Sequence, residues 1–169
     1  MGGDPTQIGE DKEGNKINLI VDGTYNRGLK ASLGAQGMNG WIWGLITLDS
    51  MRYSIPDDSY YDRDAIIEEI LRLQLPDGGF SFYNDRTDPD MTGMALQALA
   101  PYYNSEQYYT YEQKNTKKTV TKTVRQVVDE ALDTLSILQL SDGNFESWGE
   151  ENAESTAQVM VALTALGID

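Results

Sequence analysis

Apolar residues recur at spacings of three and four in two otherwise charged stretches of the chain. The longer stripe consists of Val124, Val127, Val128, Ala131, Leu132, Leu135 and Leu138, and the shorter one of Ile66, Ile67, Ile70 and Leu71. A repeat near 3.6 residues with charged side chains between the apolar ones is typical of an amphipathic helix. Both stretches are therefore predicted to form helices that bury one face and expose the other.

Two further segments have a different pattern. Residues 90–100 and 154–166 are rich in alanine, glycine and threonine and contain little charge. Such a composition suits a helix that neighbouring elements surround on most sides. We predict that these two helices form an inner layer and that the charged helices lie outside them.

An internal repeat joins these helices. Residues 73–80 (LQLPDGGF) match residues 138–145 (LQLSDGNF) at an offset of 65, and residues 90–93 match residues 154–157 at an offset of 64. A weaker third copy begins at Asn39, at an offset of 51, and its matching pairs are Trp41 with Thr92, Leu45 with Leu96, and Leu48 with Leu99. Internal similarity of this kind indicates a repeat protein. Each unit is predicted to be a helix, a turn and a second helix.

The residues of the repeated turn suit a tight connection after a helix. Gly78 and Gly143 stand where a left-handed backbone is wanted, which glycine adopts without steric cost. Asp77 and Asp142 can accept hydrogen bonds from turn amides. Two glutamines can bond to loop backbone and two phenylalanines can fold back as apolar plugs: Gln74, Gln139, Phe80 and Phe145.

Asp90 and Glu154 stand at the predicted starts of the inner helices. A carboxylate at that position meets unpaired backbone amides and the positive end of the helix dipole. Both residues are therefore predicted to be helix N-caps.

Residues 102–123 have no counterpart in the weaker third copy. Within them, residues 109–112 and 119–124 alternate in polarity like strands, which predicts a small β-hairpin insert; a disordered loop is the alternative. Residues 1–28 are predicted to be extended, with a turn at residues 13–16. The expected organisation is an amino-terminal segment at 1–28 and a repeat domain at 29–169 that carries the insert.

Composition and charge remove several classes of function. The 169 residues include no cysteine and no histidine, which excludes disulfides, zinc fingers and imidazole bases. Any metal site must be built from oxygen ligands. The balance of 13 basic and 27 acidic residues gives a net charge of −14, so nucleic acid is not an expected partner. No apolar run approaches the roughly 18 residues of a membrane span, so membrane insertion is not expected.

The two QxxDG(G/N)F turns, each followed by a small-residue helix, resemble the prenyltransferase and squalene-cyclase repeat. The resemblance covers residues 37–169 and implies an all-α fold, a partial α/α toroid of about two and a half helical hairpins. Residues 87–99 (TDPDMTGMALQAL) look most like bacterial cell-surface members allied to the transcobalamin-type cobalamin-binding branch. A complete toroid has more hairpins, and we expect the chain to be a fragment of a longer protein.

The same resemblance implies a function and a location. It favours a non-catalytic ligand-binding or scaffold module of a secreted or cell-surface bacterial protein. The expected ligand is a small molecule such as a corrinoid, or a surface polymer, and no cofactor is indicated. Because different members of this superfamily use one scaffold for different purposes, the fold alone does not select among them.

An enzymatic alternative rests on Asp90. Asp88-Pro89-Asp90-Met91-Thr92 resembles the DxDDT motif of class II terpene cyclases, in which the middle aspartate protonates the substrate. That chemistry needs a carboxyl group that is kept protonated. Met91 replaces the last aspartate of the motif, and Glu154 occupies the place of Asp90 in the next repeat. These two departures favour a helix cap at Asp90 over a general acid.

The expected ligand contacts lie at the starts of the inner helices and in the turns before them. In a toroid these ends surround the mouth of the central cavity. The candidates are Trp41, Trp43, Tyr83, Asp88, Asp90, Trp148 and Glu154; core packing is the alternative for the tryptophans. A weaker candidate for calcium is the loop with Asp85, Asp88 and Asp90, whose spacing is not that of an EF-hand.

The last predicted helix leaves an apolar edge without a following hairpin. Val159, Val161, Leu163 and Leu166 lie on it, and only some of them can point into the preceding hairpin. Repeat units bury their faces against neighbours. We expect this edge to be covered by the rest of the toroid, by a second copy of the chain, or by the segment around residues 17–21.

Overall fold

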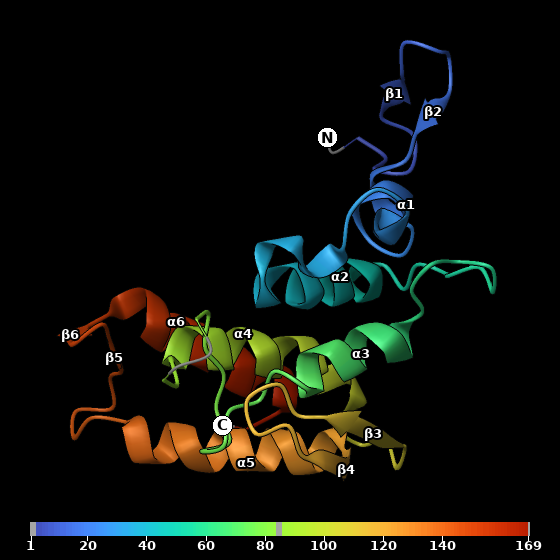
Figure 1. The fold of residues 1–169 in the computed structure, drawn as a ribbon. Helices are drawn as coiled ribbons and strands as arrows, with labels where there is room; N and C mark the ends of the chain where they lie inside the picture. Colours follow the sequence, from blue (N-terminus) through green and yellow to red (C-terminus); the bar gives the residue numbers. More distant parts are fainter. Residues whose placement is uncertain (1–2, 84–85, 169) are drawn as a thin grey trace. The chain divides into compact units, whose positions relative to one another are not determined.

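The computed structural model describes residues 3–83 and 86–168, and it contains both helices and strands (Figure 1). Helices make up 47% of the chain and strands 11%. The chain divides into two compact units, Met1–Ile67 and Glu68–Asp169. The prediction of an all-α fold is therefore wrong, because three antiparallel β-hairpins accompany the helices within the described ranges.

The strands lie in the connections, where the helical periodicity carries no information. The hairpins are β1 (Gly9–Glu10) with β2 (Lys16–Ile17), β3 (Tyr108–Glu112) with β4 (Thr119–Thr123), and β5 (Glu146–Ser147) with β6 (Glu150–Glu151). The β3–β4 pair is the hairpin predicted in the 102–123 insert, and that prediction is confirmed. The other two hairpins have strands of only two residues, too short for alternation to reveal.

The first unit begins with the β1–β2 hairpin, followed by helix α1 (Leu19–Gly23), so the amino-terminal segment is not extended throughout. Asn18 caps α1 by accepting hydrogen bonds from two backbone amides. Two short 3-10 turns, η1 (Arg27–Leu29) and η2 (Leu33–Gln36), lead into helix α2 (Met38–Ser50). The amino-terminal stretch is thus locally ordered by a turn and a cap.

Helix α2 packs closely on η2 because two of its residues are glycines. A Cβ atom on Gly40 would lie 1.9 Å from the carbonyl oxygen of Leu33, and one on Gly44 would lie 2.8 Å from a Leu33 methyl carbon. Trp41 is buried on the same helix, edge-to-face with Tyr61 at 5.2 Å. The core of this unit is therefore built around α2.

Helix α3 (Arg63–Leu71) runs across the boundary between the two units. Its first residue is fixed by the end of α2: the Arg63 guanidinium donates to Asp49 at 2.8 Å and to the carbonyl oxygens of Leu48 and Tyr53 at 3.0 and 2.7 Å. Ile66, Ile67, Ile70 and Leu71, the predicted apolar stripe, are all fully buried.

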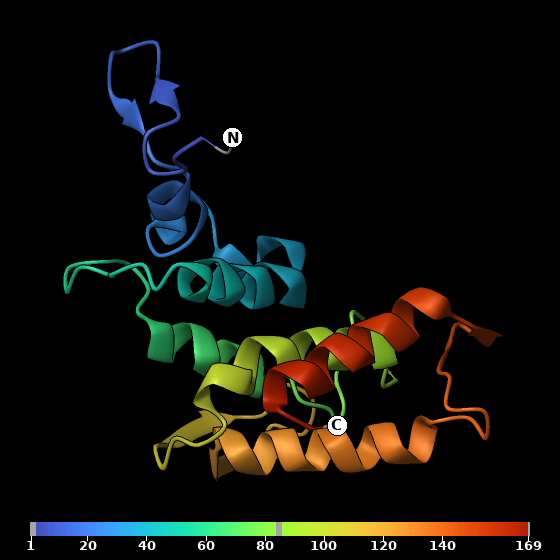
Figure 2. The same cartoon turned by 180° about the vertical axis from the view of Figure 1, so that it is seen from behind.

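The second unit contains helices α4 (Pro89–Leu99), α5 (Val124–Leu138) and α6 (Ala153–Leu166), with the 3-10 turn η3 (Ala100–Tyr102) after α4. Helices α4 and α6 lie side by side, and α5 packs on α4 (Figure 2). A Cβ atom on Gly93 of α4 would lie 3.0 Å from the Gln158 carbonyl group of α6, so the two backbones nearly touch there. Helix α5 has the bounds predicted for it and starts with a capping box between Thr123 and Gln126.

The two repeated turns have the same internal hydrogen bonds. We name residues 74–80 the first turn and residues 139–145 the second turn. The glutamine Nε2 donates to the carbonyl oxygen of the turn glycine at 2.9 Å (Gln74 to Gly78) and at 3.1 Å (Gln139 to Gly143). Both glycines have positive φ, 94° and 89°. Asp77 and Asp142 each accept a hydrogen bond from the amide two residues ahead.

The ends of the two turns also match. The Phe80 amide donates to the Thr92 hydroxyl, and the Phe145 amide donates to the Thr156 hydroxyl, both at 3.0 Å. Each threonine belongs to the helix that follows its turn. Both phenylalanine side chains are buried. The roles predicted for the glutamine, aspartate, glycine and phenylalanine positions are therefore confirmed in both turns.

The predicted helix caps, in contrast, are displaced by two residues. Asp88 caps α4 by accepting from the Met91 amide, and Asn152 caps α6 by accepting from the Ser155 amide. Asp90 and Glu154 lie two positions later, in the first helical turns. The prediction that they are N-caps is wrong. In α4, Pro89 takes the first helical position and leaves the capping role to Asp88, and in α6 the cap is supplied by Asn152, directly before the first helical residue.

The predicted inner helices differ in burial. Eight of the eleven residues of α4 are buried, whereas only Ser155, Val159 and Ala162 are buried on α6. The expectation of a helix enclosed on most sides thus holds for α4 and fails for α6. Helix α4 packs against both α5 and α6, whereas α6 packs mainly against α4.

Candidate functional site

Three of the predicted site carboxylates come together at the adjacent starts of α4 and α6. Asp88 is the α4 cap, and Asp90 and Glu154 hold equivalent positions in the first turns of the two helices. Since α4 and α6 pack side by side, their amino-terminal ends bring these side chains within electrostatic reach of one another. The positive ends of two helix dipoles favour negative charge at this place.

Asp90 has a perturbed pKa. It is half-buried, and burial is the main cause that raises its pKa above the ordinary value, with further contributions from the charges of Asp88 and Glu154. Desolvation and like charges both disfavour the ionised form of a carboxyl group. The site therefore holds one carboxyl group, that of Asp90, whose protonated form is favoured.

Asp88 is held by hydrogen bonds from two elements. One carboxylate oxygen accepts from the Met91 amide at 3.0 Å, and the other accepts from the Ser147 hydroxyl of β5 at 2.8 Å. Ser147 thus fixes the β5–β6 hairpin against the start of α4. Sequence reasoning missed Ser147, and Gly149, at the second position of the two-residue turn, was the only local signal.

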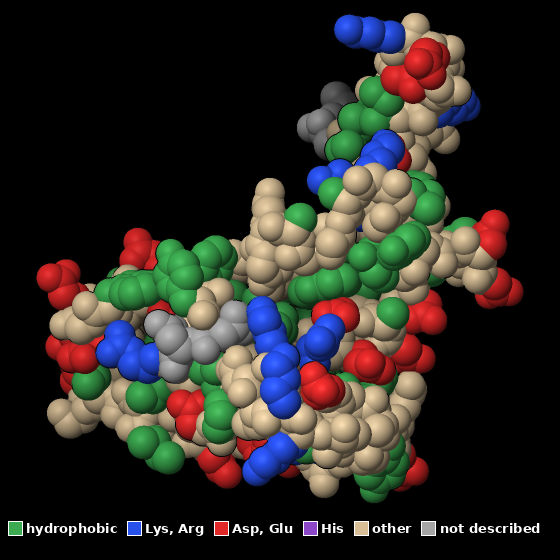
Figure 3. All heavy atoms as spheres, viewed as in Figure 1, with side chains coloured by type: hydrophobic (Ala, Val, Ile, Leu, Met, Phe, Trp, Pro, Cys, Tyr) green, Lys and Arg blue, Asp and Glu red, His purple; other side chains and the backbone are tan. Residues whose placement is uncertain are grey.

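An exposed pair of aromatic side chains accompanies the carboxylates. Tyr83, which follows the first turn, and Trp148, at the tip of the β5–β6 hairpin, lie edge-to-face with ring centres 5.9 Å apart. Their exposed fractions are 63% and 72%, and Phe82 extends the group at 4.9 Å from Tyr83. Hydrophobic side chains gather at the surface over the start of α6, with acidic side chains around them (Figure 3).

The backbone at Trp148 is in an unusual conformation. Its φ is 58°, and the next residue, Gly149, has φ 85°. Two successive positive φ values are those of a type I′ turn, in which asparagine or glycine usually stands where this chain has tryptophan. The turn holds a large apolar side chain in the solvent at an energetic cost.

The remaining predicted site residues have other positions. Trp41 and Trp43 lie on α2 in the first unit. Trp41 is buried against Tyr61 and is a core residue, whereas the Trp43 side chain is exposed. Asp85, from the calcium candidate, lies outside the described residues. Among the residues that are described, no group of three or more acidic side chains is placed to hold a metal ion.

We name the surface formed by Tyr83, Trp148, Asp88, Asp90 and Glu154 the aromatic–acid surface. It offers flat apolar faces beside carboxylates that can accept hydrogen bonds. Such a surface can hold an organic molecule that presents both apolar area and hydrogen-bond donors.

In the described parts of the chain, no helix is long and apolar enough to cross a membrane. Comparisons with protein-family models, with curated proteins and with solved structures found no match to this chain.

Proposed function

We propose that the chain is a non-catalytic binding module whose ligand is held at the aromatic–acid surface. The observation that supports this most is the exposed Tyr83–Trp148 pair next to three carboxylates. Soluble proteins seldom expose neighbouring large aromatic side chains unless these contact a partner. The positive φ at Trp148 costs conformational energy, and such strain is more often kept at functional sites, which also favours a binding role.

The chemistry of the surface suits a ligand that stacks on aromatic rings and donates hydrogen bonds to carboxylates. A corrinoid, with its apolar macrocycle and peripheral amides, has both features, and so does a cell-surface polymer built of sugars. The resemblance to the prenyltransferase and squalene-cyclase repeat supports the same class of ligand and a secreted or cell-surface location.

Isothermal titration calorimetry with cyanocobalamin and with a neutral oligosaccharide tests the proposal. We expect saturable binding of one of them, and loss of that binding in Trp148→Ala. Trp43→Ala is the matched control, because Trp43 is also exposed but lies in the other unit. Binding that Trp148→Ala leaves intact, or the absence of heat with both ligands, would contradict the proposal.

A second function has one observation in its favour. The raised pKa of Asp90 is the property that a terpene-cyclase-like general acid requires. Incubation with squalene or a prenyl diphosphate, followed by product analysis, distinguishes the two functions. Cyclised product that disappears in Asp90→Asn at unchanged thermal stability would support catalysis over binding.

A further inference from the structure

The aromatic rings at and beside the aromatic–acid surface face in different directions. The Tyr83 and Trp148 ring planes are 74° apart, and the Phe82 and Tyr83 ring planes are 84° apart. A ligand stacks on an aromatic ring when its own flat face lies parallel to that ring. A rigid planar molecule can therefore stack on only one of two such neighbouring rings. A ligand made of small rings joined by rotatable bonds can stack on both.

Pyranose sugars are small rings of this kind. A β-linked glucose unit carries its hydroxyl groups around the rim of the ring, so both ring faces present only C–H groups. Such a face removes apolar area from water when it covers an exposed aromatic ring, which is favourable. The bonds between successive sugar units rotate, so neighbouring units can follow two differently oriented rings whose centres are 5.9 Å apart, those of Tyr83 and Trp148.

The rim hydroxyl groups of a sugar find acceptors at the adjacent starts of α4 and α6. Each Asp88 carboxylate oxygen accepts one hydrogen bond from the described residues, one from the Met91 amide and the other from the Ser147 hydroxyl. Since a carboxylate oxygen can accept two hydrogen bonds, each has room for another donor. Glu154, in the first turn of α6, is exposed and adds a second carboxylate. Hydrogen bonds from hydroxyl groups to these carboxylates are charge-assisted and therefore strong.

The charge around the rings disfavours acidic sugars. Three exposed glutamates flank Trp148 in the β5–β6 hairpin: Glu146, Glu150 and Glu151. In the two stretches of sequence that form this region, residues 82–91 and 146–155, Arg86 is the one basic residue. Like charges repel, so a uronate or a sulfated sugar is a poor ligand here. An uncharged sugar avoids this repulsion.

We propose that the aromatic–acid surface binds an uncharged oligosaccharide of β-linked glucose units. Successive sugar rings stack on Trp148 and Tyr83, and sugar hydroxyl groups donate to the carboxylates at the starts of α4 and α6. This inference rests on the proposed binding function and selects one of its two classes of ligand. A corrinoid is one rigid macrocycle and stacks on a single ring, whereas the oligosaccharide uses both.

Isothermal titration calorimetry of the whole chain with glucose, laminaribiose and laminaritetraose tests the inference. These sugars consist of the same unit and differ in length. We expect affinity to rise from glucose to laminaritetraose, because only a second sugar ring can engage the second aromatic ring. A galacturonic acid tetramer should bind more weakly than laminaritetraose, and the difference should shrink at high salt because it arises from charge repulsion.

Substitutions at Trp148 separate ring stacking from the shape of the turn. Trp148→Ala and Trp148→Phe both keep a non-glycine residue at φ 58°, but only phenylalanine keeps a flat ring. Trp148→Ala should lower the affinity for laminaritetraose by about tenfold, and Trp148→Phe should lower it much less. Tyr83→Ala should reduce the gain in affinity with chain length. Tyr108→Ala is the matched control, because Tyr108 is 66% exposed, close to the 63% of Tyr83, and lies on β3.

Three results would overturn the inference. If cyanocobalamin binds and Trp148→Ala abolishes this binding, while laminaritetraose does not bind, the binding function stands but the ligand is the macrocycle. If neither molecule binds, the binding function fails together with the inference. If Trp148→Ala and Trp148→Phe weaken laminaritetraose binding equally at unchanged melting temperature, ring stacking is not the source of the affinity.

Discussion

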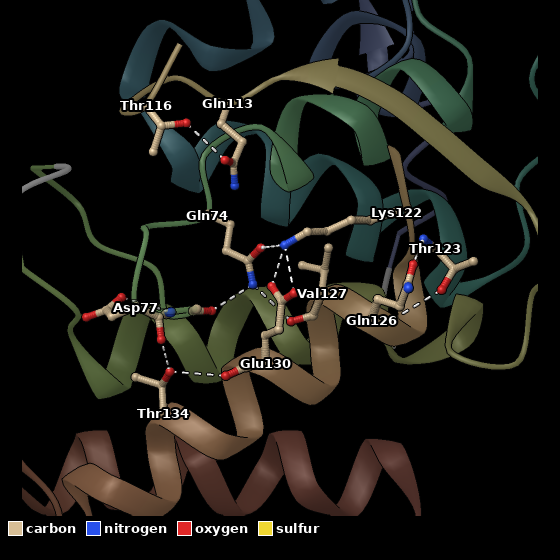
Figure 4. A network of polar contacts seen from close by, with 12 residues as sticks. Gln74, Asp77, Gln113, Thr116, Lys122, Thr123, Gln126, Val127, Glu130 and Thr134 are labelled. Atoms are coloured by element: carbon tan, nitrogen blue, oxygen red, sulfur yellow. Dashed lines mark hydrogen bonds and ion pairs between the residues drawn. The ribbon is translucent and has the colours of Figure 1, made fainter. Parts of the chain in front are cut away.

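Gln74 and Gln139 hold the same position in the two turns, but only Gln74 is buried. Gln74→Ala removes the side-chain donor to the carbonyl oxygens of Gly78 and Val127, so the buried turn loses its internal bond and its link to α5 (Figure 4). We expect it to lower the free energy of unfolding by about 1–3 kcal/mol. Gln139→Ala should cost well under about 1 kcal/mol, because water can replace an exposed hydrogen bond. Urea unfolding of both variants measures the difference. Equal decreases in the free energy of unfolding would contradict the burial of the first turn under α5.

The raised pKa of Asp90 predicts a sign for its pH dependence. A carboxyl group whose pKa is higher in the folded state binds its proton more tightly there, so folding stability falls as pH rises through that pKa. The stability of wild type relative to Asp90→Asn should therefore decrease between pH 4 and pH 7.

Unfolding curves of the two proteins at both pH values provide this measurement. Asp11 is a control of opposite sign, because hydrogen bonds, chiefly from Asn15, lower its pKa. An increase of the Asp90 difference with pH would show that the carboxylate is not disfavoured at the starts of α4 and α6.

At the scale of elements, the contact between α4 and α6 depends on one glycine. Gly93→Ala places a Cβ atom 3.0 Å from the Gln158 carbonyl group, which the backbone of α6 can relieve only by shifting. Overpacking of this kind costs about 1–3 kcal/mol, more than the gain in helix propensity of about 1 kcal/mol. A net decrease in melting temperature is expected. Gly23→Ala, in α1, is the control, because nothing lies within 4 Å of the added atom.

The sequence predicts the elements whose signal is periodic or repeated and misses those whose signal is short. The apolar stripe from Val124 to Leu138 predicted the bounds of α5. The match between residues 73–80 and 138–145 predicted the roles of the turn residues. Both predictions succeeded because helix periodicity and turn shape depend on local backbone geometry. The two-residue strands β1, β2, β5 and β6 escaped prediction. The α4 cap was misplaced because carboxylates at positions 88 and 90 look alike in sequence, and only the position of Pro89 separates them.

The candidate site was predictable in part. Tyr83, Trp148, Asp88, Asp90 and Glu154 were expected at the starts of the inner helices or in the turns before them. Asp88, Asp90 and Glu154 lie at the starts of α4 and α6, and Tyr83 and Trp148 lie in the connections before these helices. Ser147 joins them only through pairing across the β5–β6 hairpin and a 59-residue separation from Asp88, which no local pattern reveals.

For the whole molecule, charge is the dominant property. A net charge of −14, with nine acidic and no basic residues after Arg125, implies self-repulsion in the folded state. The melting temperature at pH 7 should rise as sodium chloride increases from about 10 to about 150 mM, because the Debye length shortens from about 30 to about 8 Å. Near the isoelectric point of about 4.2 the same change should have little effect. A salt-independent melting temperature at pH 7 would contradict net repulsion.

The two copies of the turn also separate two stages of folding. Each turn is shaped by bonds between residues close in sequence, such as Gln74 and Gly78, whereas the hydrogen bonds between the first turn and α5 join residues 53 and 57 apart. Short loops close faster than long ones, so we expect turns to form first and the bonds to α5 to follow. Thr134→Val, which removes one of the bonds to α5, should then accelerate unfolding more than it slows refolding, which stopped-flow kinetics can measure; a change confined to refolding would reverse this order. A repeat of this kind can assemble in the direction of its synthesis, with each new hairpin settling on a turn that has already formed.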